Sequence, residues 1–329
     1  MTSDPSSLRV IAAEGAVFER VLDARCRTSG TGLDRQACAR FHNARMKTSW
    51  GGRHQRTVAL VDGENVLASA DRYDQAGTLD GRAVRVCAIG SLRADASEAG
   101  DAHAATLIDT LLADAARDGA EMALLFSPAD LGARLRGAFP VMPLTDLTLS
   151  VTESPRHGAP MTMVRGGEER DLAAIVAMGR VRAERVRFHL DRDSDFIQYV
   201  ITRKRLLAGL GSAHARQLHF FIAEEGVTAA AYVIVSVVGD AWTLEECGDR
   251  DASGARVGAL LQALIAREPV ERRPTIRAWL PPGFLPPQVG IASSMPSPDT
   301  ISVGMIGPRA IAPPLLCADD VLFWRNDLL

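Results

Sequence analysis

The segment from residue 82 to residue 112 constrains the fold most, because a strand passes through small residues directly into an amphipathic helix. Apolar residues up to Leu92 are typical of a strand, and residues 103–118 have the spacing of a helix with one apolar face. The first turn of a helix leaves backbone N–H groups unpaired and carries the positive end of the helix dipole. Small residues also let an anion approach closely. The segment therefore predicts an anion site where the helix begins.

The turn resembles the phosphate-binding loop of the GNAT superfamily, the acyl-CoA-dependent N-acetyltransferases. In that family the fourth strand leads into a loop of pattern (Arg/Gln)-x-x-Gly-x-(Gly/Ala), which holds the pyrophosphate of coenzyme A. Here Ala104 fits the pattern, whereas Ala99 replaces the basic residue and Ala102 replaces the central glycine. The same turn carries three carboxylates that oppose the binding of a pyrophosphate, those of Asp95, Glu98 and Asp101.

Length, charge and cysteine content exclude several classes of protein. A chain of 329 residues with 47% apolar residues is long enough for two cores. A net charge of −3 gives no basic surface for nucleic acid. No apolar run reaches the ~18 residues that cross a bilayer, and the first residues lack a signal-peptide pattern, so we expect a cytoplasmic protein without a membrane partner. The five cysteines have no Cys-x-x-Cys spacing and predict neither disulfides nor a metal site.

The order of elements in the first half of the chain matches a GNAT domain. Two helices are predicted within residues 15–47, and a hairpin of two strands surrounds the turn at 62–65. A third strand crosses 77–81, and the segment described above follows it. The remaining predicted elements are a strand at 121–126, a short helix at 129–137 and a strand at 144–151. This order places a first domain at residues 1–152.

After a linker of turn-forming residues at 153–160, the same order begins again. The elements predicted there are a strand at 161–165, helices at 168–188 and 195–209, strands at 218–223, 229–237 and 242–247, a helix at 255–267 and a strand at 275–280. This pattern resembles a second, more divergent GNAT-like domain at residues 161–329. The fold class is therefore α/β (α+β), with two tandem GNAT domains. Each is a mixed, mostly antiparallel twisted sheet flanked by helices.

The resemblance implies a set of residues that bind the cofactor. In the family the fourth strand is splayed, and its backbone groups bind the pantetheine arm and polarise the acyl carbonyl. The corresponding positions here are Ile89, Gly90, Ser91 and Leu92 on the strand, and Gly100, Asp101, Ala102, His103 and Ala104 in the turn. The pair Gly90 and Ser91 suits a β-bulge, although an ordinary central strand is an equal alternative.

Proton transfer needs a group that the family usually supplies as a tyrosine after the fifth strand. Arg134 stands in that place here. Tyr73, on the third strand, is the tyrosine near enough to the first cleft to replace it, and its alternative role is that of a half-buried strand residue. Tyr73 and Ser91 are therefore the candidate catalytic residues.

The second domain offers an alternative site in the turn between its strand at 242–247 and its helix at 255–267. Gly248 and Gly254 bound this turn, Arg250 and Arg256 are possible phosphate partners, and Glu245 and Glu246 are possible bases. Asp249 and Asp251 offset the two arginines. A charged surface turn that caps the helix is the other interpretation.

The resulting hypothesis is a bacterial-type N-acetyltransferase. It transfers an acetyl group from acetyl-CoA to a primary amine of a small molecule or peptide by direct attack, without a metal, and a homodimer is one oligomeric state to consider. One alternative is a catalytically decayed GNAT-fold protein that binds an acyl-CoA or a partner protein. The other alternative places the active site in the C-terminal domain.

Overall fold

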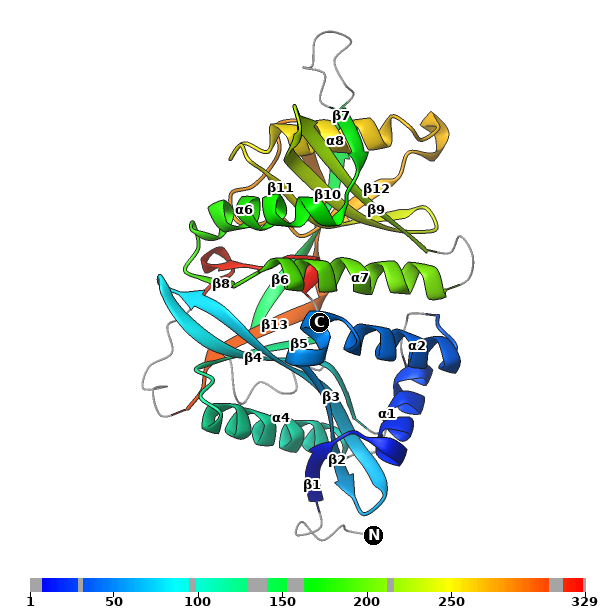
Figure 1. Cartoon of the computed structure of the whole chain (residues 1–329), viewed down its shortest axis with the longest axis vertical. Helices are drawn as coiled ribbons and strands as arrows, with labels where there is room; N and C mark the ends of the chain where they lie inside the picture. The colour runs from blue at the N-terminus through cyan, green and yellow to red at the C-terminus, as the bar shows by residue number, and fades with distance from the viewer. Residues whose placement is uncertain are drawn as a thin grey trace. The chain divides into compact units, whose positions relative to one another are not determined.

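The computed structural model describes residues 8–28, 32–94, 99–128, 141–152, 163–211, 216–307 and 316–327. The chain divides into two compact units (Figure 1). Unit 1 comprises residues 1–144, 297–318 and 328–329, and unit 2 comprises residues 145–296 and 319–327. Within the described residues, no helix combines the length and the apolar character that a membrane span requires.

Unit 1 is a sheet with the strand order β1-β2-β3-β4-β5-β13, in which only the β4–β5 ladder is parallel among the described pairs. Its strands are β1 (Leu8–Ala12), β2 (Gln55–Asp62), β3 (Asn65–Leu79), β4 (Arg82–Ala94), β5 (Met122–Pro128) and the second half of β13 (Val289–Met305). Its helices are α1 (Gly15–Thr28), α2 (Arg35–Met46), α3 (Ser49–His54) and α4 (Gly100–Arg117).

The two faces of this sheet carry different helices. Helix α4 packs its apolar side, which includes Leu107 and Leu111, against Cys87 and Ile89 of β4. Because side chains alternate along a strand, Asp71 and Tyr73 of β3 point to the opposite face. Helices α1 and α2 lie beside the sheet (Figure 1), and with α3 they supply the contacts on that face, through Arg25, Arg45 and Trp50.

Unit 2 repeats this arrangement with a sheet in the order β6-β12-β11-β10-β9-β7, and its β11–β12 ladder is parallel. Its strands are β6 (Val141–Val151, from residue 145 on), β7 (Met163–Gly166), β8 (Phe188–Leu190), β9 (Arg216–Glu225), β10 (Thr228–Val238), β11 (Ala241–Asp249), β12 (Thr275–Ala278) and β14 (Val321–Leu322). The helices are α6 (Leu172–Ala183), α7 (Ser194–Leu210) and α8 (Ala255–Ile265), with the 3-10 turns η2 (Glu169–Asp171), η3 (Val270–Arg272), η4 (Ala318–Asp320, from residue 319 on) and η5 (Arg325–Asp327).

The two units are not separated at a single position in the sequence, because residues 297–318 belong to unit 1 although they follow most of unit 2. The strand predicted at 144–151 is present as β6, but it does not close unit 1, because its residues Leu147–Leu149 pair with β12 in unit 2. The neighbour of β5 in unit 1 is β13, whose residues Asp299–Met305 pair with Met122–Pro128. A strand from the last tenth of the chain therefore completes the sheet of unit 1.

Most predicted elements are present with small shifts of their ends. The two N-terminal helices, the hairpin around residues 62–65 and the strand–turn–helix segment are confirmed. The helix expected at 168–188 is shorter, because a 3-10 turn precedes α6 and the chain returns as strand β8 from Phe188. The helix predicted at 129–137 and the linker at 153–160 lie outside the described residues.

Candidate active site

Strand β4 contains a bulge at Ser91, which is one of the two alternatives that the sequence left open for this position. Ser69 of β3 faces Arg93, and Asp71 faces Gly90, so Ser91 and Leu92 together face one residue of β3. Ser91 has φ +53°, a left-handed backbone conformation that residues other than glycine adopt rarely. The parallel pairs between β4 and β5 end at Ile89 and Leu125. The bulge therefore lies where β4 leaves its partner, and it bends the strand there.

Five residues separate the end of β4 from the first turn of α4. Ala99 is the residue before the helix, and no side chain caps the helix at that position. Gly100 and Ala104 are buried, whereas Asp101 and Ala102 are exposed, and His103 is half-buried. Small residues and first-turn N–H groups suit a phosphate, while the Asp101 carboxylate opposes one unless it turns into solvent. Asp95 and Glu98 lie outside the described residues.

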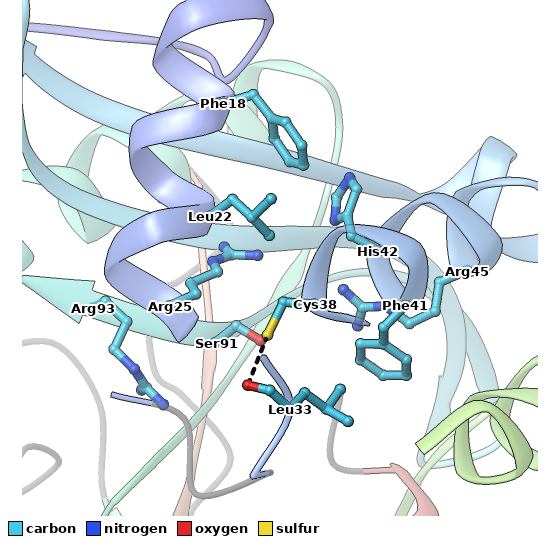
Figure 2. A pocket seen from close by; sticks show the side chains of 10 residues that line it. All are labelled: Phe18, Leu22, Arg25, Leu33, Cys38, Phe41, His42, Arg45, Ser91 and Arg93. Carbon is cyan, nitrogen blue, oxygen red and sulfur yellow. Dashed lines mark hydrogen bonds between the residues drawn. The ribbon is translucent and has the colours of Figure 1, made fainter. Parts of the chain in front are cut away.

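A cavity of about 200 Å³ adjoins the bulge on the face that carries α1 and α2. Figure 2 shows side chains of the two helices turned toward one another across this space, with Ser91 and Arg93 of β4 at its side. We call it the α1–α2 pocket, and it is lined by Phe18, Leu22, Arg25, Leu33, Cys38, Phe41, His42, Arg45, Ser91 and Arg93. Its walls thus combine an apolar surface with three guanidinium groups.

A buried carboxylate, that of Asp71, lies beneath two of these arginines. Its oxygens are 3.0 and 3.1 Å from Arg25 Nη1, and one is 3.6 Å from Arg45 Nη2. Thr57 donates a further hydrogen bond of 2.6 Å. Burial alone raises the pKa of Asp71, but Arg25 and Arg45 outweigh it and lower the pKa to about 2. Asp71 therefore stays ionised and holds the two helices on the sheet.

The pocket has a positive potential that acts on its other titratable groups. Burial and the charge of Arg45 lower the pKa of His42 to about 4, so its imidazole is uncharged at neutral pH. The His42 ring also packs 4.5 Å from that of Phe18, centroid to centroid. Burial and the charge of Arg25 likewise lower the pKa of Arg93. Each group thus lies near at least one arginine of the pocket, while the Asp71 carboxylate partly offsets this effect on His42.

Unit 2 has the same local pattern, but its own side chains occupy it. Ile234 of β10 faces Glu246 and Val235 faces Leu244, which leaves Glu245 as the bulge residue of β11. The parallel pairs with β12 end at Leu244 and Ala278. The bulge and the end of the ladder therefore coincide, as they do in β4.

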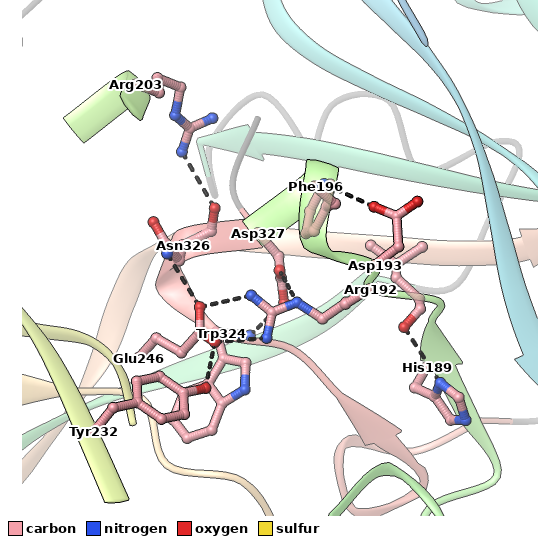
Figure 3. A network of polar contacts seen from close by, with 11 residues as sticks. His189, Arg192, Asp193, Phe196, Arg203, Tyr232, Glu246, Trp324, Asn326 and Asp327 are labelled. Carbon is pink, nitrogen blue, oxygen red and sulfur yellow. Dashed lines mark hydrogen bonds and ion pairs between the residues drawn. The ribbon is translucent and has the colours of Figure 1, made fainter. Parts of the chain in front are cut away.

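Beyond this bulge, the buried Glu246 carboxylate is at the centre of a polar network (Figure 3). Arg192 donates two hydrogen bonds to it, of 2.9 and 2.6 Å, and the Tyr232 hydroxyl donates one of 2.6 Å. Asn326 of η5 donates another of 3.0 Å. The neighbouring Arg325 stacks 4.4 Å over the ring of Trp279, which follows β12. Residues of η5 thus contact both sides of the opening between β11 and β12.

The start of α8 is also capped from within unit 2. Asp249 accepts hydrogen bonds from the backbone N–H groups of Arg256 at 2.8 Å and Val257 at 3.4 Å. Its other oxygen is 3.2 Å from Arg256 Nη1. At Gly254, a methyl group would come within 2.5 Å of Phe284. A carboxylate of the chain therefore holds the place at which a phosphate would bind.

Comparisons with known proteins agree with this geometry. No protein-family model and no curated protein matches the chain. Among solved structures, a GCN5-related N-acetyltransferase from Kribbella flavida has 16% identity and a TM-score of 0.65 over 92% of this chain and 72% of that one. Eis1 from Mycobacterium abscessus has 13% identity and a TM-score of 0.54, over 90% and 73%. The N-myristoyltransferase of Saccharomyces cerevisiae, solved with bound myristoyl-CoA, has 10% identity and a TM-score of 0.51, over 91% and 82%.

The chain is a tandem GNAT-fold protein. Its structural neighbours include acetyltransferases, and each of its units contains a corner at which a parallel ladder ends beside a bulge. In unit 1, the predicted strand residues Ile89, Gly90, Ser91 and Leu92 all lie at this corner. The predicted turn residues, Gly100 to Ala104, form the first turn of the helix that follows.

The two predicted catalytic residues lie at different depths in unit 1 of this GNAT-fold protein. Ser91 is half-exposed and lines the α1–α2 pocket. Tyr73 is fully buried below it, stacked 6.2 Å from Trp50, and its hydroxyl is 3.5 Å from an Asp71 oxygen. Tyr73 is not among the described residues that line the pocket.

Sequence reasoning missed the charged residues of the pocket. Arg25 and Arg45 precede Asp71 by 46 and 26 residues, and only the fold brings them to its carboxylate. One signal was present: Asp71 is an acidic residue that directly follows the mostly apolar strand segment of residues 66–70. A carboxylate on the buried face of a strand requires a cation opposite it.

Proposed function

We propose that unit 1 is an N-acyltransferase that transfers an acetyl group from acetyl-CoA to an amine held in the α1–α2 pocket. The observation that carries the proposal is the bulge at Ser91. There the β4–β5 ladder ends, the backbone is turned out of the ladder and a cavity begins. The resemblance of the fold to acyltransferases supports the same class of reaction.

Two parts of unit 1 have the chemistry needed to hold acetyl-CoA. Backbone groups freed from the ladder at Gly90, Ser91 and Leu92 would bind the pantetheine arm, and a bulge N–H would donate to the thioester oxygen as negative charge develops on it. The first turn of α4, from Gly100 to Ala104, would take the pyrophosphate. The exposed position of Asp101 allows its carboxylate to point into solvent.

The proposed reaction is a direct displacement. The amine nitrogen attacks the thioester carbonyl carbon, a C–N bond forms and the C–S bond breaks. The amine proton passes to solvent, and coenzyme A leaves as a thiolate that then takes up a proton. Ser91 lines the pocket at the bulge, and its side chain is placed to guide the proton that the thiolate takes up. Asp71 is a poor base, because its pKa is about 2 and Arg25 holds it.

The alternative that the active site lies in unit 2 is disfavoured by its contents. Glu246 is held by Arg192, Tyr232 and Asn326, and the start of α8 is capped by Asp249. Arg256 binds Asp249 and also Glu225. A phosphate at α8 would have to displace a carboxylate that already accepts the first-turn N–H groups.

Calorimetric titration with acetyl-CoA tests the proposal. We expect the wild-type chain to bind, and Ala102→Glu to raise Kd by at least about tenfold, because it adds a carboxylate to the first turn of α4. The matched variant Ala255→Glu adds the same charge to the first turn of α8 and is expected to change Kd by less than about twofold.

Release of coenzyme A thiol in the presence of amines then separates transfer from binding. Binding without thiol release for any amine would support the decayed, acyl-CoA-binding alternative. An Ala255→Glu variant that loses binding, while Ala102→Glu keeps it, would move the site to unit 2. Absence of binding by the wild-type chain would reject both units as acetyl-CoA sites.

A further inference from the structure

The charges of the α1–α2 pocket say what kind of amine it fits. Ten described residues line it, and among them the ionised side chains at neutral pH are Arg25, Arg45 and Arg93, with no Asp or Glu. The carboxylate of Asp71 lies under the pocket and is fully buried. With Asp71 included, this described part of unit 1 contains the three positive charges of the arginines and one negative charge. His42 adds none, since its pKa is about 4.

Such a pocket is unfavourable for a polycation and favourable for an anion. Burial, and after it the charge of a neighbouring arginine, lowers the pKa of Arg93 and of His42, and a further cation would meet the same desolvation and repulsion. A carboxylate placed among the guanidiniums would instead relieve it, in a half-buried site where water screens charge poorly. The planar fork of arginine matches a carboxylate with two parallel hydrogen bonds.

The remaining lining gives the size and polarity of the rest of the ligand. Phe18, Leu22 and Phe41 form an apolar wall, and the cavity of about 200 Å³ is smaller than the sites of drug-sized ligands, which begin near ~300 Å³. Ser91 is at the side of the pocket where the bulge lies. A ligand that fills this cavity and places its amine at Ser91 would therefore be about the size of one amino acid.

We propose that the acceptor of unit 1 is a small amine that carries a carboxylate and an apolar side chain, as a free hydrophobic amino acid does. The arginines hold the carboxylate, the apolar wall holds the side chain, and the amine is directed to the bulge at Ser91. This inference rests on the proposed acyltransferase function, and it names the substrate class of that same site.

Two matched pairs of amines test it: L-phenylalanine with 2-phenylethylamine, and L-leucine with 3-methylbutylamine. Each pair differs by the carboxylate, and spermidine serves as the polycation. With saturating acetyl-CoA, we expect kcat/KM for the amino acid to exceed that of its partner by at least about tenfold in one pair or both, and spermidine to react most slowly. Preference for the amine without carboxylate in both pairs, or for spermidine, would overturn the proposal.

The variant Arg93→Gln tests whether the preference for a carboxylate arises in the α1–α2 pocket. Arg93 is half-buried and donates to the Leu92 carbonyl oxygen at 2.8 Å. Arg93→Gln is expected to lower kcat/KM for the preferred amino acid about tenfold and to change that of its partner less than about twofold. Arg20→Gln removes an exposed arginine of α1 that pairs with Glu64 outside the pocket, and it should leave both values unchanged. An equal loss for both amines in Arg93→Gln would contradict a carboxylate contact.

A binding measurement keeps this test separate from the proposed function. N-acetyl-L-phenylalanine and N-acetyl-2-phenylethylamine mimic the two products, and titration of the wild-type chain with each needs no transfer. We expect the acid to bind at least about tenfold more tightly and the difference to shrink in Arg93→Gln. If acetyl-CoA binds but the neutral product binds as well as the acid, the carboxylate inference fails and the acyltransferase proposal stands.

Discussion

The corner of β4 and α4 in unit 1 and the corner of β11 and α8 in unit 2 have the same backbone plan and opposite contents. In both, a parallel ladder ends at a bulge and a helix follows. In unit 1 the bulge residue is the half-exposed Ser91, which lines a pocket. In unit 2 it is the buried Glu245, whose carboxylate is 2.8 Å from Lys204 Nζ.

This difference shows that the same backbone corner can either bind a ligand or be stabilised by side chains of the chain itself. A splayed pair of strands leaves polar backbone groups that need partners, and those partners come from a ligand or from the chain. Unit 2 supplies them with charged side chains and the η5 segment: Lys204 pairs with Glu245, and Arg192 pairs with both Glu246 and Asp327. We infer that the corner of unit 2 is the more rigid of the two, because its polar groups have partners within the chain. The following predictions can break or sharpen this comparison.

The largest expected effect comes from Arg192, which serves two carboxylates in unit 2. It donates to both oxygens of Glu246 and is 3.2 Å from Asp327. Arg192→Met would leave two buried carboxylates without their cation, so we expect the free energy of unfolding to fall by about 3–5 kcal/mol in denaturant titrations. Arg170→Met, at an exposed pair with Glu168, should cost less than about 1 kcal/mol. A similar small loss in Arg192→Met would mean that the network does not support unit 2.

The next effect depends on pH and on Asp327. Burial, opposed by Arg192 and reinforced by Glu246, raises the pKa of Asp327 to about 6. The folded chain then keeps this proton at a pH where the unfolded chain has lost it. Stability is therefore greatest below the usual pKa of 3.8 and falls as pH rises toward 6, by up to about 3 kcal/mol.

Comparison with Asp327→Asn isolates this contribution from that of other groups. His42 acts in the opposite direction, since its lowered pKa makes the folded chain less stable as pH falls from 6.5 to about 4. The difference in unfolding free energy, variant minus wild type, should grow in favour of the variant between pH 4 and pH 6. A flat difference across that range would show that Asp327 is ionised throughout.

The sequence predicted the corner of unit 1 better than its pocket. The bulge depends on neighbouring residues, so Gly90 and Ser91 indicated it as one of two equal interpretations, and local residues also predicted the hairpin around residues 62–65. The pocket depends on contacts between α1, α2 and β3 that local patterns do not encode. Likewise, nothing in the run at 297–305 shows that it pairs with β5, which lies about 170 residues earlier.

A moderate effect is expected at the bulge of unit 1. Ser91 has φ +53°, where a side chain costs about 1 kcal/mol relative to glycine. Ser91→Gly should therefore raise the free energy of unfolding by about that amount. It also removes the hydroxyl and keeps the bulge N–H groups, so the kcat of acetyl transfer measures what the hydroxyl contributes. If the Ser91 hydroxyl guides the proton, we expect kcat to fall by at least about tenfold, which corresponds to about 1.4 kcal/mol of activation free energy. Unchanged kcat would assign the role of the bulge to its backbone alone.

The smallest effect is expected from the hydroxyl of Tyr73, and a tyrosine in unit 2 provides its control. The Tyr73 hydroxyl is 3.5 Å from an Asp71 oxygen, at the limit of a hydrogen bond, whereas that of Tyr232 is 2.6 Å from Glu246. Tyr73→Phe should change the free energy of unfolding by less than about 1 kcal/mol, and Tyr232→Phe should lower it by about 1.5–3 kcal/mol. Because Tyr73 lies below the pocket, kcat of acetyl transfer should also stay within about twofold. A tenfold loss of kcat in Tyr73→Phe, with unchanged stability and a shifted pH profile, would instead make Asp71 and Tyr73 a proton path beneath the pocket.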